Sequence, residues 1–385
     1  MTGEPQTSVK RGSDRLEIAS INKFYYPKIG GIENVVRSIS EGLVEEGHQA
    51  RVVAAVPRGW GRRERYNGVS IRKAGSLGVV KSVPIAPEFP KHLHDAVQTA
   101  DIVHHHLPNP LGPVSEMLVP SGDAKRVVTY HSDIVRQKFA LQAYKPVLKR
   151  FLASADRIIV TSPNLRDNSE FLSPHAEKCD VVPLSVPLEE YGTYNGPDYN
   201  LPLDENENIV LFVGRLNYYK GVTHLIDAMA EVDGKLLVVG DGNRREALKQ
   251  QTREAGLDDS IVFLGRVEDE LLHYCYSVAD LFVLPSVAAS EAFGIVQLEA
   301  MAYGAPVVNT ALPTGVPWVS VDGETGRTVP PGDSSALGEA IQSLLSDSDT
   351  RQRFGENARK RVEKNFSRTD MLESIRDIYG SVLDS

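Results

Sequence analysis

The sequence predicts an α/β protein built from two doubly wound domains, each a mostly parallel sheet with helices on both faces. A chain of 385 residues is longer than one such core usually requires. Short apolar, β-branched runs alternate with helical patterns in both halves, as parallel sheets require. That alternation stops once, near residues 186–207, and then restarts. We expect the carboxyl edges of the two sheets to face each other across a central cleft, where ligands of such sheets bind.

The first half contains six apolar runs that fit buried strands. They are LEIASI, RVVAAV, ADIVHHH, RVVTYH, DRIIVTS and DVVPLSV. After the first run, a turn at Gly30 and Gly31 precedes apolar residues spaced three or four apart, which predicts a helix. This helix is expected to end at Gly47, because glycine readily takes the left-handed conformation that closes helices. The chain therefore opens with a strand, a glycine loop and a helix.

The second half begins after a segment with the composition of a linker. Residues 186–207 lack periodicity and are rich in Pro, Gly, Asn and acidic residues. Beyond them the strand candidates are NIVLFVGR, KLLVVGDG, SIVFLGRV, LFVLPS and APVVNT, and the helix candidates are 222–231, 243–256, 268–279, 294–303 and the tail from about 335 to 385. The predicted organisation is an N-terminal domain 1–187, a linker 188–207, a C-terminal domain 208–367, and a final helix 368–385 that packs back across the junction.

Charge is distributed unevenly along the chain, and this excludes one class of partner. The formal net charge is −9, and residues 1–200 carry 25 Lys and Arg against 22 Asp and Glu, whereas the remaining 185 residues carry 17 against 29. Binding to a phosphate backbone needs clustered positive charge that releases counterions. The acidic C-terminal half does not supply it, so we expect no nucleic-acid partner.

The sequence indicates a cytoplasmic protein, with one segment that favours contact with a membrane surface. No stretch approaches about eighteen consecutive apolar residues, and the polar N-terminus lacks the pattern of a signal peptide. Cys179 and Cys275 lack metal-ligand spacing and fit a reducing compartment. Residues 136–151 interleave five cations with Phe, Leu, Tyr and Val, which predicts peripheral docking at the inner face of a membrane. The alternative is a solvated helix face whose apolar residues join the core.

Two carboxylates follow the buried run LFVLPS. Glu291 and Glu299 lie eight residues apart, which is about 12 Å along a helix that begins near Phe293. This matches the span of a sugar diphosphate. Glu291 would then contact a transferred hexose and Glu299 the ribose hydroxyls, while the phosphates would meet the backbone N–H groups of Phe293, Gly294 and Ile295. The alternative is a helix-terminal carboxylate at Glu291 and a surface residue at Glu299.

Two cations follow the first strand of the second half. In GRLNYYKG, Arg215 and Lys220 would stand at the carboxyl edge of the sheet. A departing nucleoside diphosphate gains negative charge, which fixed cations and backbone dipoles neutralise when no metal is present. The alternative is a pair of surface charges at the end of a loop.

In the first half, the loop before the helix and several histidines are candidates for ligand contact. Gly30 and Gly31 would let backbone N–H groups line a nest for phosphate or sugar. His131 follows the strand RVVTY, and we expect it at the carboxyl edge of the sheet together with His104, His105 and His106. A histidine at such a position is either structural or catalytic, and the sequence leaves both open.

Together these residues give the chain a family resemblance. It resembles the retaining GT-B glycosyltransferases of the large family that contains O-antigen mannosyltransferases and glycogen synthase relatives, over residues 16–375. The motifs that carry the resemblance are the GG loop at Gly30 and Gly31, the stretch TYHSD with His131 and Asp133, Gly-Arg-x4-Lys-Gly with Arg215 and Lys220, Gly-Asp-Gly from Gly240 to Gly242, and the pair Glu291 and Glu299.

The resemblance implies a hexosyltransferase with two Rossmann-like domains that retains anomeric configuration. Its donor would be a nucleotide-diphosphate sugar, with GDP-mannose favoured and a UDP-sugar as the alternative, and its acceptor a glycan or a lipid-linked group; no cofactor is expected. The implied contacts are Glu291 and His131 with the sugar, Glu299 with the ribose, and Arg215 and Lys220 with the diphosphate. Backbone near Gly265, Arg266 and Val267 is expected to recognise the base.

The sequence also bears on metal use and on competing functions. Glycosyltransferases that hold a metal generally use an acid-any-acid triplet after a strand, and the triplet Asp347-Ser348-Asp349 instead lies in the helical tail, where we expect it to cap a helix. We therefore predict a metal-independent enzyme with no metal ligands. Two alternatives stay open, a nucleotide-sugar epimerase of the same fold and a non-catalytic sensor of nucleotide sugars.

Overall fold

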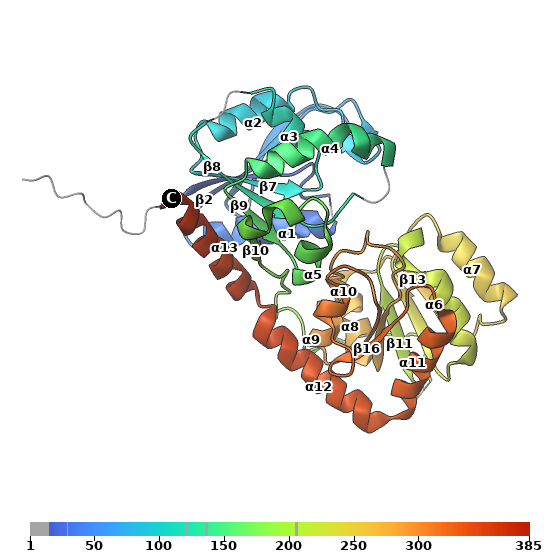
Figure 1. Ribbon diagram of the computed structural model, residues 1–385. Coiled ribbons are helices and arrows are strands. Elements are labelled where there is room, and N and C mark those ends of the chain that lie inside the picture. The colour runs from blue at the N-terminus through green and yellow to red at the C-terminus, as the bar shows by residue number, and fades with distance from the viewer. Residues whose placement is uncertain (1–14, 29, 120–121, 135–137, 205–206) are drawn as a thin grey trace, which may run out of the picture. The chain divides into compact units, whose positions relative to one another are not determined.

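The computed structural model describes residues 15–28, 30–119, 122–134, 138–204 and 207–385 (Figure 1). The chain divides into two compact units. The first contains residues 1–128, 154–156 and 381–385, and the second contains residues 129–153 and 157–380. The predicted limits of the domains and of the linker stay a prediction.

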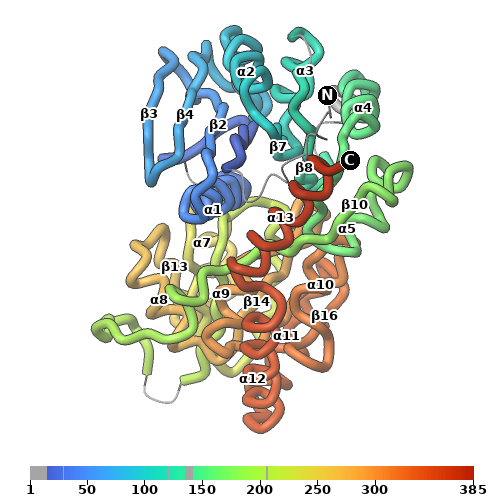
Figure 2. The backbone as a smooth tube through the Cα atoms, turned by 90° about the vertical axis from the view of Figure 1, so that its left-hand side faces the viewer, coloured from blue at the N-terminus to red at the C-terminus, as the bar shows by residue number. Residues whose placement is uncertain are grey.

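The first sheet has eight strands within the described residues, in the order β10-β9-β8-β7-β1-β2-β4-β3. Strand β1 pairs in parallel with β2 on one side and β7 on the other. The edge strand β3 runs antiparallel to β4, and the two lie side by side in Figure 2. Because the chain order reverses between β1 and β7, the loops that follow these strands diverge at the carboxyl edge. The strands are β1 (Glu17–Ile21), β2 (Gln49–Ala55), β3 (Arg62–Tyr66), β4 (Val69–Ala74), β7 (Ile102–Leu107), β8 (Lys125–Tyr130), β9 (Arg157–Val160) and β10 (Cys179–Val181).

Alternating side chains of β2 show why this sheet needs apolar residues on both faces. Val52 and Ala54 join a core with helix α1 (Gly31–Glu45), whereas Val53 and Ala55 join a core with helix α2 (Phe89–Val97). Successive side chains of a strand point to opposite faces, so a strand covered on both sides is apolar throughout. The continuous run RVVAAV is the sequence signature of that arrangement.

The second sheet has six strands within the described residues, in the order β13-β12-β11-β14-β15-β16, and all its pairs are parallel. Numbered from its first strand, this is the 3-2-1-4-5-6 order of a doubly wound nucleotide-binding sheet. The strands are β11 (Ile209–Val213), β12 (Lys235–Val239), β13 (Ile261–Gly265), β14 (Leu281–Leu284), β15 (Val307–Thr310) and β16 (Gly326–Val329).

Helices cover both faces of the second sheet as well. Alternate residues of β11 divide between two cores, with Val210 and Phe212 on one face and Leu211 and Val213 on the other. The first core includes residues of α6 (Val222–Ala228), α7 (Arg245–Glu254) and α11 (Ser334–Ser346), and the second includes residues of α8 (Asp269–Val278), α9 (Val296–Ala302) and α12 (Ser348–Asn365). Both sheets therefore have the doubly wound α/β architecture that the sequence predicts.

Several predicted element boundaries are confirmed. Helix α1 is followed by Gly47, which has φ +92° and so takes the predicted left-handed closing conformation. The tail is helical, with α11, α12 and α13 (Arg368–Leu383) in succession. Asp347 caps α12, because its carboxylate accepts the backbone N–H of Thr350 at 3.0 Å. The acid-any-acid triplet is thus a helix cap, as expected.

Other predictions are wrong in detail. His104, His105 and His106 do not stand at the edge of the sheet, because β7 continues to Leu107 and encloses all three in the core. The helix expected to begin near Phe293 begins at Val296. The structure also contains elements that the apolar pattern does not predict, namely β16, the hairpin β3–β4, and the short hairpin of β5 (Val79–Val80) and β6 (Val83–Pro84).

The segment predicted to dock at a membrane lies partly outside the described residues. Of residues 136–151, residues 136 and 137 are not described, and α4 (Lys138–Ala153) covers the rest. In its second half, Leu148 and Phe151 are buried, and Lys145 pairs with Glu170 at 2.9 Å. These contacts are those of a helix whose apolar residues join the core, and docking through this segment stays a prediction. None of the helices in the described part of the chain is both long and apolar enough to cross a membrane.

Candidate functional site

The strand order of the second sheet defines where a ligand site is expected in that unit. Strand β11 lies between β12 and β14, with Leu211 paired to Phe282 across the junction. The chain leaves β11 in one direction and β14 in the other, which opens a crevice between the two following loops. These loops are residues 214–221 and 285–295. Among the residues that the sequence singled out, they contain Arg215, Lys220, Glu291 and residues 293–295.

The 214–221 loop is held against the carboxyl end of β14. Gly221 has φ +69°, and a side chain there would overlap the carbonyl of Pro285. The N–H of Val287 donates to the carbonyl of Tyr219 at 2.8 Å and joins the two loops directly. A left-handed residue without a Cβ is therefore needed at this point. This contact fixes the position of Lys220, the preceding residue.

Lys220 and Glu291 form a buried ion pair at the switch point. The ammonium Nζ lies 2.6 Å from Oε2 of Glu291, and the two residues are only 7% and 9% exposed. The hydroxyl of Ser286 donates to the same oxygen at 3.2 Å, and the hydroxyl of Thr310 donates to the Ser286 carbonyl at 2.5 Å. The structure thus brings together two residues that the sequence analysis had assigned to different parts of the donor.

The arrangement leaves Lys220 with capacity for a further partner. An ammonium group has three N–H donors, of which the carboxylate of Glu291 uses one. Burying a charge is unfavourable unless the charge is paired. Pairing with Glu291 therefore allows the Lys220 ammonium group to stay charged although it is largely shielded from water. In such surroundings a cation interacts with an approaching anion more strongly than it would in water.

Glu299 lies on α9 and is oriented by an aromatic group. The Tyr276 hydroxyl donates to its Oε2 at 2.5 Å, and Tyr276 stacks on Tyr303 with ring centroids 5.9 Å apart. Burial raises the pKa of Glu299, while the Tyr276 hydrogen bond and the charge of Lys220 oppose the rise. Lys220, which pairs with Glu291, therefore also acts on Glu299 through its charge.

The backbone between Phe293 and Ile295 forms a turn instead of the first turn of a helix. Gly294 has φ +72°, and a Cβ there would lie 2.5 Å from a methyl carbon of Leu284. The structure records no acceptor among the described residues for the N–H groups of Phe293, Gly294 and Ile295. These three N–H groups precede α9 in the same loop as Glu291, and N–H groups of this kind can bind an anion.

Arg215, Arg266 and Gly240 occupy the same carboxyl edge in different ways. Both arginine side chains are exposed. Gly240 follows β12, donates its N–H to the Gly265 carbonyl at 2.7 Å, and has no room for a side chain because the carbonyl of Gly214 lies against it. Its glycine is therefore required by close backbone contact, which is a structural reason that does not depend on a ligand.

The glycine loop of the first unit follows β1 at the switch point of the first sheet. Gly30 is extended, with φ −173°, and a Cβ there would overlap the carboxylate of Glu33. A Cβ on Gly31 would meet nothing within 4 Å. The first turn of α1 therefore has open space next to Gly31, and the folded chain does not itself require glycine at that position.

His131 follows β8 in the second unit, where it is buried. Burial lowers its pKa to about 3, so the imidazole is neutral near neutral pH. Its neighbour Asp133 accepts hydrogen bonds at 2.7 Å from the hydroxyls of both Tyr130 and Ser169. A neutral imidazole can hydrogen-bond a sugar hydroxyl but does not act as a general acid at this pH. The carboxylate of Asp133 is already engaged in orienting the loop.

His105 has a structural partner in the first unit. Its Nε2 lies 2.9 Å from Oε2 of Glu116, which also pairs with Arg126. Burial opposes ionisation of Glu116, but hydrogen bonds and charges from His105 and Arg126 outweigh it and lower its pKa to about 2. His105 thus has a core partner, which fits the structural alternative left open by the sequence.

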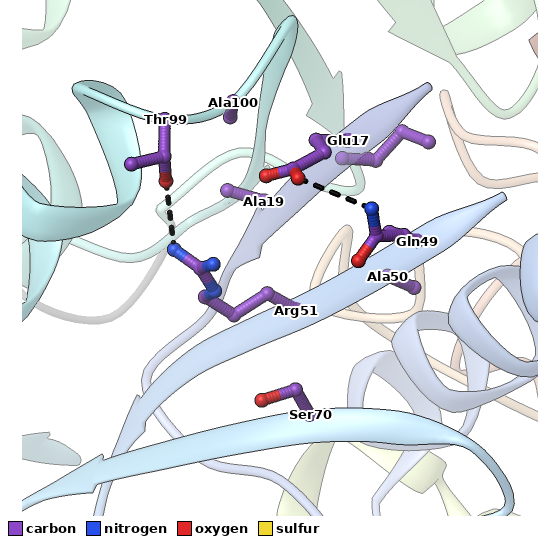
Figure 3. A pocket seen from close by; sticks show the side chains of 9 residues that line it. Glu17, Ala19, Gln49, Ala50, Arg51, Ser70, Thr99 and Ala100 are labelled. Atoms are coloured by element: carbon purple, nitrogen blue, oxygen red, sulfur yellow. Dashed lines mark hydrogen bonds between the residues drawn. The ribbon is translucent and has the colours of Figure 1, made fainter. Parts of the chain in front are cut away.

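The structure has a pocket at the opposite edge of the first sheet (Figure 3). It lies where β1, β2 and β4 begin, and Arg51 and Gln49 point into it. Arg51 donates to the Thr99 hydroxyl at 2.9 Å and Gln49 to Glu17 at 3.1 Å. Its polar groups therefore partner one another, and ligands of open α/β sheets bind at the other edge. This pocket is not the candidate site.

Two residues that orient the candidate glutamates were not predicted from the sequence, namely Ser286, which contacts Glu291, and Tyr276, which contacts Glu299. Ser286 follows β14 at its carboxyl edge, so its position in the run LFVLPS was an available signal. Tyr276 lies on α8, and nothing in its sequence surroundings indicated contact with Glu299. Among the described residues, no three or more His, Cys, Asp and Glu side chains form a group that could hold a metal ion.

Two family models together match most of the chain. Residues 29–190 match the family model of glycosyltransferase family 4, and residues 199–361 match that of glycosyl transferases group 1. The chain is 32% identical to O-antigen chain mannosyltransferase C of Escherichia coli, over 96% of this chain and 100% of that protein. It is also 32% identical to the D-rhamnosyltransferase WbpZ of Pseudomonas aeruginosa, over 88% of this chain and 89% of that protein.

Solved structures show the same fold. Sucrose-phosphate synthase from Thermosynechococcus elongatus superposes with a TM-score of 0.83 at 27% identity, covering 96% of this chain and 100% of that chain. The Anabaena protein HepE in complex with UDP-glucose gives a TM-score of 0.76 at 19% identity, covering 95% and 100%.

Proposed function

Since the chain belongs to the GT-B glycosyltransferase family that includes the O-antigen mannosyltransferases, we propose that it transfers a hexose, with mannose favoured, from a nucleotide-diphosphate sugar to a glycan or lipid-linked acceptor. The pathway we propose is surface polysaccharide or glycoconjugate synthesis. Two relatives support this proposal. One is named as an O-antigen chain mannosyltransferase, and the other is named as a D-rhamnosyltransferase. A nucleotide-sugar donor is further supported by HepE, which was solved with UDP-glucose.

The observation that carries the proposal is the buried pair of Lys220 and Glu291 at the switch point of the second sheet. A nucleotide-diphosphate sugar presents a pyrophosphate and, next to it, sugar hydroxyls. The ammonium group suits the pyrophosphate, and the carboxylate beside it suits hydroxyl donors. One ion pair thus supplies both kinds of partner at adjacent positions.

The remaining candidate residues have the following proposed roles. Arg215 and the N–H groups of residues 293–295 bind the pyrophosphate with Lys220, and Glu299 accepts hydrogen bonds from the ribose. Backbone near Gly265 and Arg266 recognises the base. Gly31 lets the first turn of α1 approach a phosphate or sugar, and neutral His131 hydrogen-bonds the sugar near its reacting carbon.

We propose that the transfer retains anomeric configuration and needs no metal. The bond between the anomeric carbon and the phosphate oxygen breaks while a bond to the acceptor oxygen forms on the same face. The acceptor proton passes to the departing phosphate, so no separate protein base is required. The cations at Arg215 and Lys220 supply the charge that a metal would otherwise provide.

A ligand screen tests the donor assignment. Melting temperatures are measured with UDP, GDP, ADP and their sugars, because a ligand that binds the folded state raises its melting temperature. We expect the largest rise with GDP and GDP-mannose. If none of the nucleotides raises the melting temperature of the wild-type protein, the donor assignment is wrong.

The reaction itself is tested with the donor that the screen identifies. Incubation with that donor and a lipid-linked acceptor should give a glycosylated product whose anomeric proton coupling matches the donor, with or without a chelator. Inverted coupling would contradict retention, and loss of activity with chelator would contradict metal independence. The epimerase alternative finds no support in the comparisons, and incubation with donor alone should yield no epimer.

A further inference from the structure

The first unit carries a cluster of exposed apolar side chains around the hairpin of β5 and β6. Trp60 is 94% exposed and Leu77 is 74% exposed, which is unusual for large apolar residues. The other exposed members are Val79, Val80 and Ile85. We call residues 57–85 the hairpin surface. Single exposed apolar residues are common, but five on one short segment call for a partner.

Backbone hydrogen bonds hold these side chains in one place. Gly59 and Ser76 exchange two antiparallel hydrogen bonds of 2.8 and 2.9 Å, which holds the segments with Trp60 and Leu77 next to each other. The N–H of Leu77 donates to the carbonyl of Ile85 at 2.9 Å, and Val80 pairs with Val83 across the hairpin. The apolar residues therefore form one contiguous feature.

The same segment is strongly basic. It contains seven Lys and Arg residues and one Glu, whereas the whole chain has a net charge of −9. The sole acidic residue, Glu64, is neutralised by Lys73 at 2.6 Å and by Arg62. Five of the cations are exposed, namely Arg58, Arg62, Arg63, Arg65 and Lys81. The hairpin surface thus combines exposed apolar side chains with a net positive charge, although the chain as a whole is acidic.

We propose that the hairpin surface docks on an anionic lipid bilayer. Trp prefers the interface between headgroups and acyl chains, and aliphatic side chains beside it can enter that layer. Lys and Arg near a bilayer are attracted by the negative surface potential of anionic lipids. Nucleic acid would use the cations but not the exposed Leu, Val and Ile, and a protein partner gives no particular reason for the excess of arginine over acidic residues.

This inference is independent of donor identity and differs from docking through residues 136–151. Docking at the hairpin surface would keep the enzyme next to an acceptor anchored in the same bilayer. Lipid binding is measured without any sugar donor, so failure here and failure of the proposed activity can be told apart.

The test is co-sedimentation of the full-length protein with vesicles. One set contains phosphatidylcholine alone, and the other contains phosphatidylcholine and phosphatidylglycerol in equal parts. We expect binding to the anionic vesicles that weakens with added salt, with a blue shift of tryptophan fluorescence. The triple variant W60S/L77S/V80S and the triple variant R62Q/R63Q/R65Q should each bind at least about tenfold more weakly.

Matched controls separate this surface from others. The variant M117S/L118S removes two exposed apolar residues elsewhere in the first unit, and K149Q/R150Q removes exposed cations of α4. Both should bind the vesicles like the wild type, and all variants should keep the wild-type melting temperature. Loss of binding in K149Q/R150Q alone, or wild-type binding by both hairpin variants, would overturn the proposal.

A different occupant would also be detected. If the wild-type protein ignores the vesicles and is a dimer in sedimentation velocity, and W60S/L77S/V80S is a monomer, a second copy of the chain covers the surface and the lipid assignment is wrong.

Discussion

Lys220 and Glu291 each offset the free-energy cost of burying the other's charge. Removing one partner of a buried pair leaves the other as an uncompensated charge, which usually destabilises a protein more than the pair itself stabilises it. The effect of a single substitution therefore mixes lost function with lost stability. Comparing Lys220→Ala, Glu291→Gln and the double variant separates the two, because the coupling between them is measured directly.

Lys220→Ala should lower turnover more than donor affinity. Negative charge on the diphosphate grows as the sugar bond breaks, so the lysine stabilises the transition state more than the bound donor. We expect kcat to fall about 100-fold, and the donor Kd from calorimetry to rise less than about tenfold. A rise in Kd with unchanged kcat would show that Lys220 acts only in binding.

His131 should make stability depend on pH below neutrality. Its pKa is about 3 when folded and about 6.5 when unfolded, so only the unfolded chain takes up a proton between these values. The stabilisation from burying the neutral ring is complete above about pH 6.5 and declines as the pH falls toward 3.

Urea unfolding across this range tests the assignment. The dependence of the unfolding free energy on pH should be shallower in His131→Asn than in the wild type between about pH 6 and 4. Identical slopes would mean that His131 is not buried as a neutral ring. Because the pKa of folded His131 is about 3, His131 should cause no change of kcat near pH 6.5. The pH profiles of kcat for the wild type and His131→Asn should therefore have the same shape around that pH.

Tyr276 is a positioning residue for Glu299. Tyr276→Phe keeps the ring stacked on Tyr303 but removes the hydrogen bond of 2.5 Å to the carboxylate. If Glu299 binds the ribose, the donor KM should rise about fivefold to tenfold while kcat changes little, because ribose contact is the same in the ground and transition states. A fall in kcat with unchanged KM would contradict this role.

At the scale of the elements, the fold requires glycine at position 221 but not at position 31. Gly221→Ala places a Cβ on the carbonyl of Pro285 in a left-handed residue, whereas Gly31→Ala adds a methyl group to open space. We expect Gly221→Ala to lower the unfolding free energy by about 1–3 kcal/mol or more and Gly31→Ala to leave it nearly unchanged.

Gly31→Ala, which should leave stability unchanged, is the variant that tests a role of the glycine loop in activity. If the first turn of α1 approaches a ligand, Gly31→Ala should reduce activity in a protein of normal stability. Chemical unfolding and steady-state kinetics on the same samples provide the comparison. Wild-type activity in Gly31→Ala would remove the glycine loop from the site.

Buried strands could be predicted from the sequence, but the edge hairpin could not. Strands such as β11 and β12 are covered on both faces, so their apolar runs identify them. Strand β3 reads RRERY, is largely exposed, and has no apolar alternation. The turn at Asn67 and Gly68, both with positive φ, was the available signal for the hairpin β3–β4.

The site was predicted as a set of residues but not as a geometry. Lys220 and Glu291 were named from their loops, and their pairing depends on β14 adding next to β11. That adjacency follows from the strand order, which a single sequence does not reveal. The helix start was placed three residues early because Gly294 adopts a left-handed conformation that interrupts the helical pattern.

At the scale of the whole molecule, the C-terminal half is acidic, but the switch point of its sheet carries cations. The residues after position 200 carry 29 Asp and Glu against 17 Lys and Arg, yet the switch point presents Lys220 and Arg215. An anionic donor must therefore approach through a net negative field to reach a local positive site. Net charge alone would not have located this site.

Donor binding should stabilise the whole chain without a metal. A ligand at 100 times its Kd adds about 2.7 kcal/mol of stability, which raises the melting temperature by a few degrees in a protein of this size. We expect the same rise with GDP-mannose in the presence of a chelator as in its absence. A rise that appears only with added Mg²⁺ or Mn²⁺ would contradict direct neutralisation by protein cations.

The position of β11 in the middle of its sheet has a consequence for a growing polypeptide. On one side β11 pairs with β12, which begins at Lys235. On the other side it pairs with β14, whose first residue, Leu281, lies 72 positions after Ile209, the first residue of β11. Until then, the apolar sequence IVLFV presents an open edge to other chains. Fragments that stop before residue 281 should therefore aggregate more than the full chain does during synthesis.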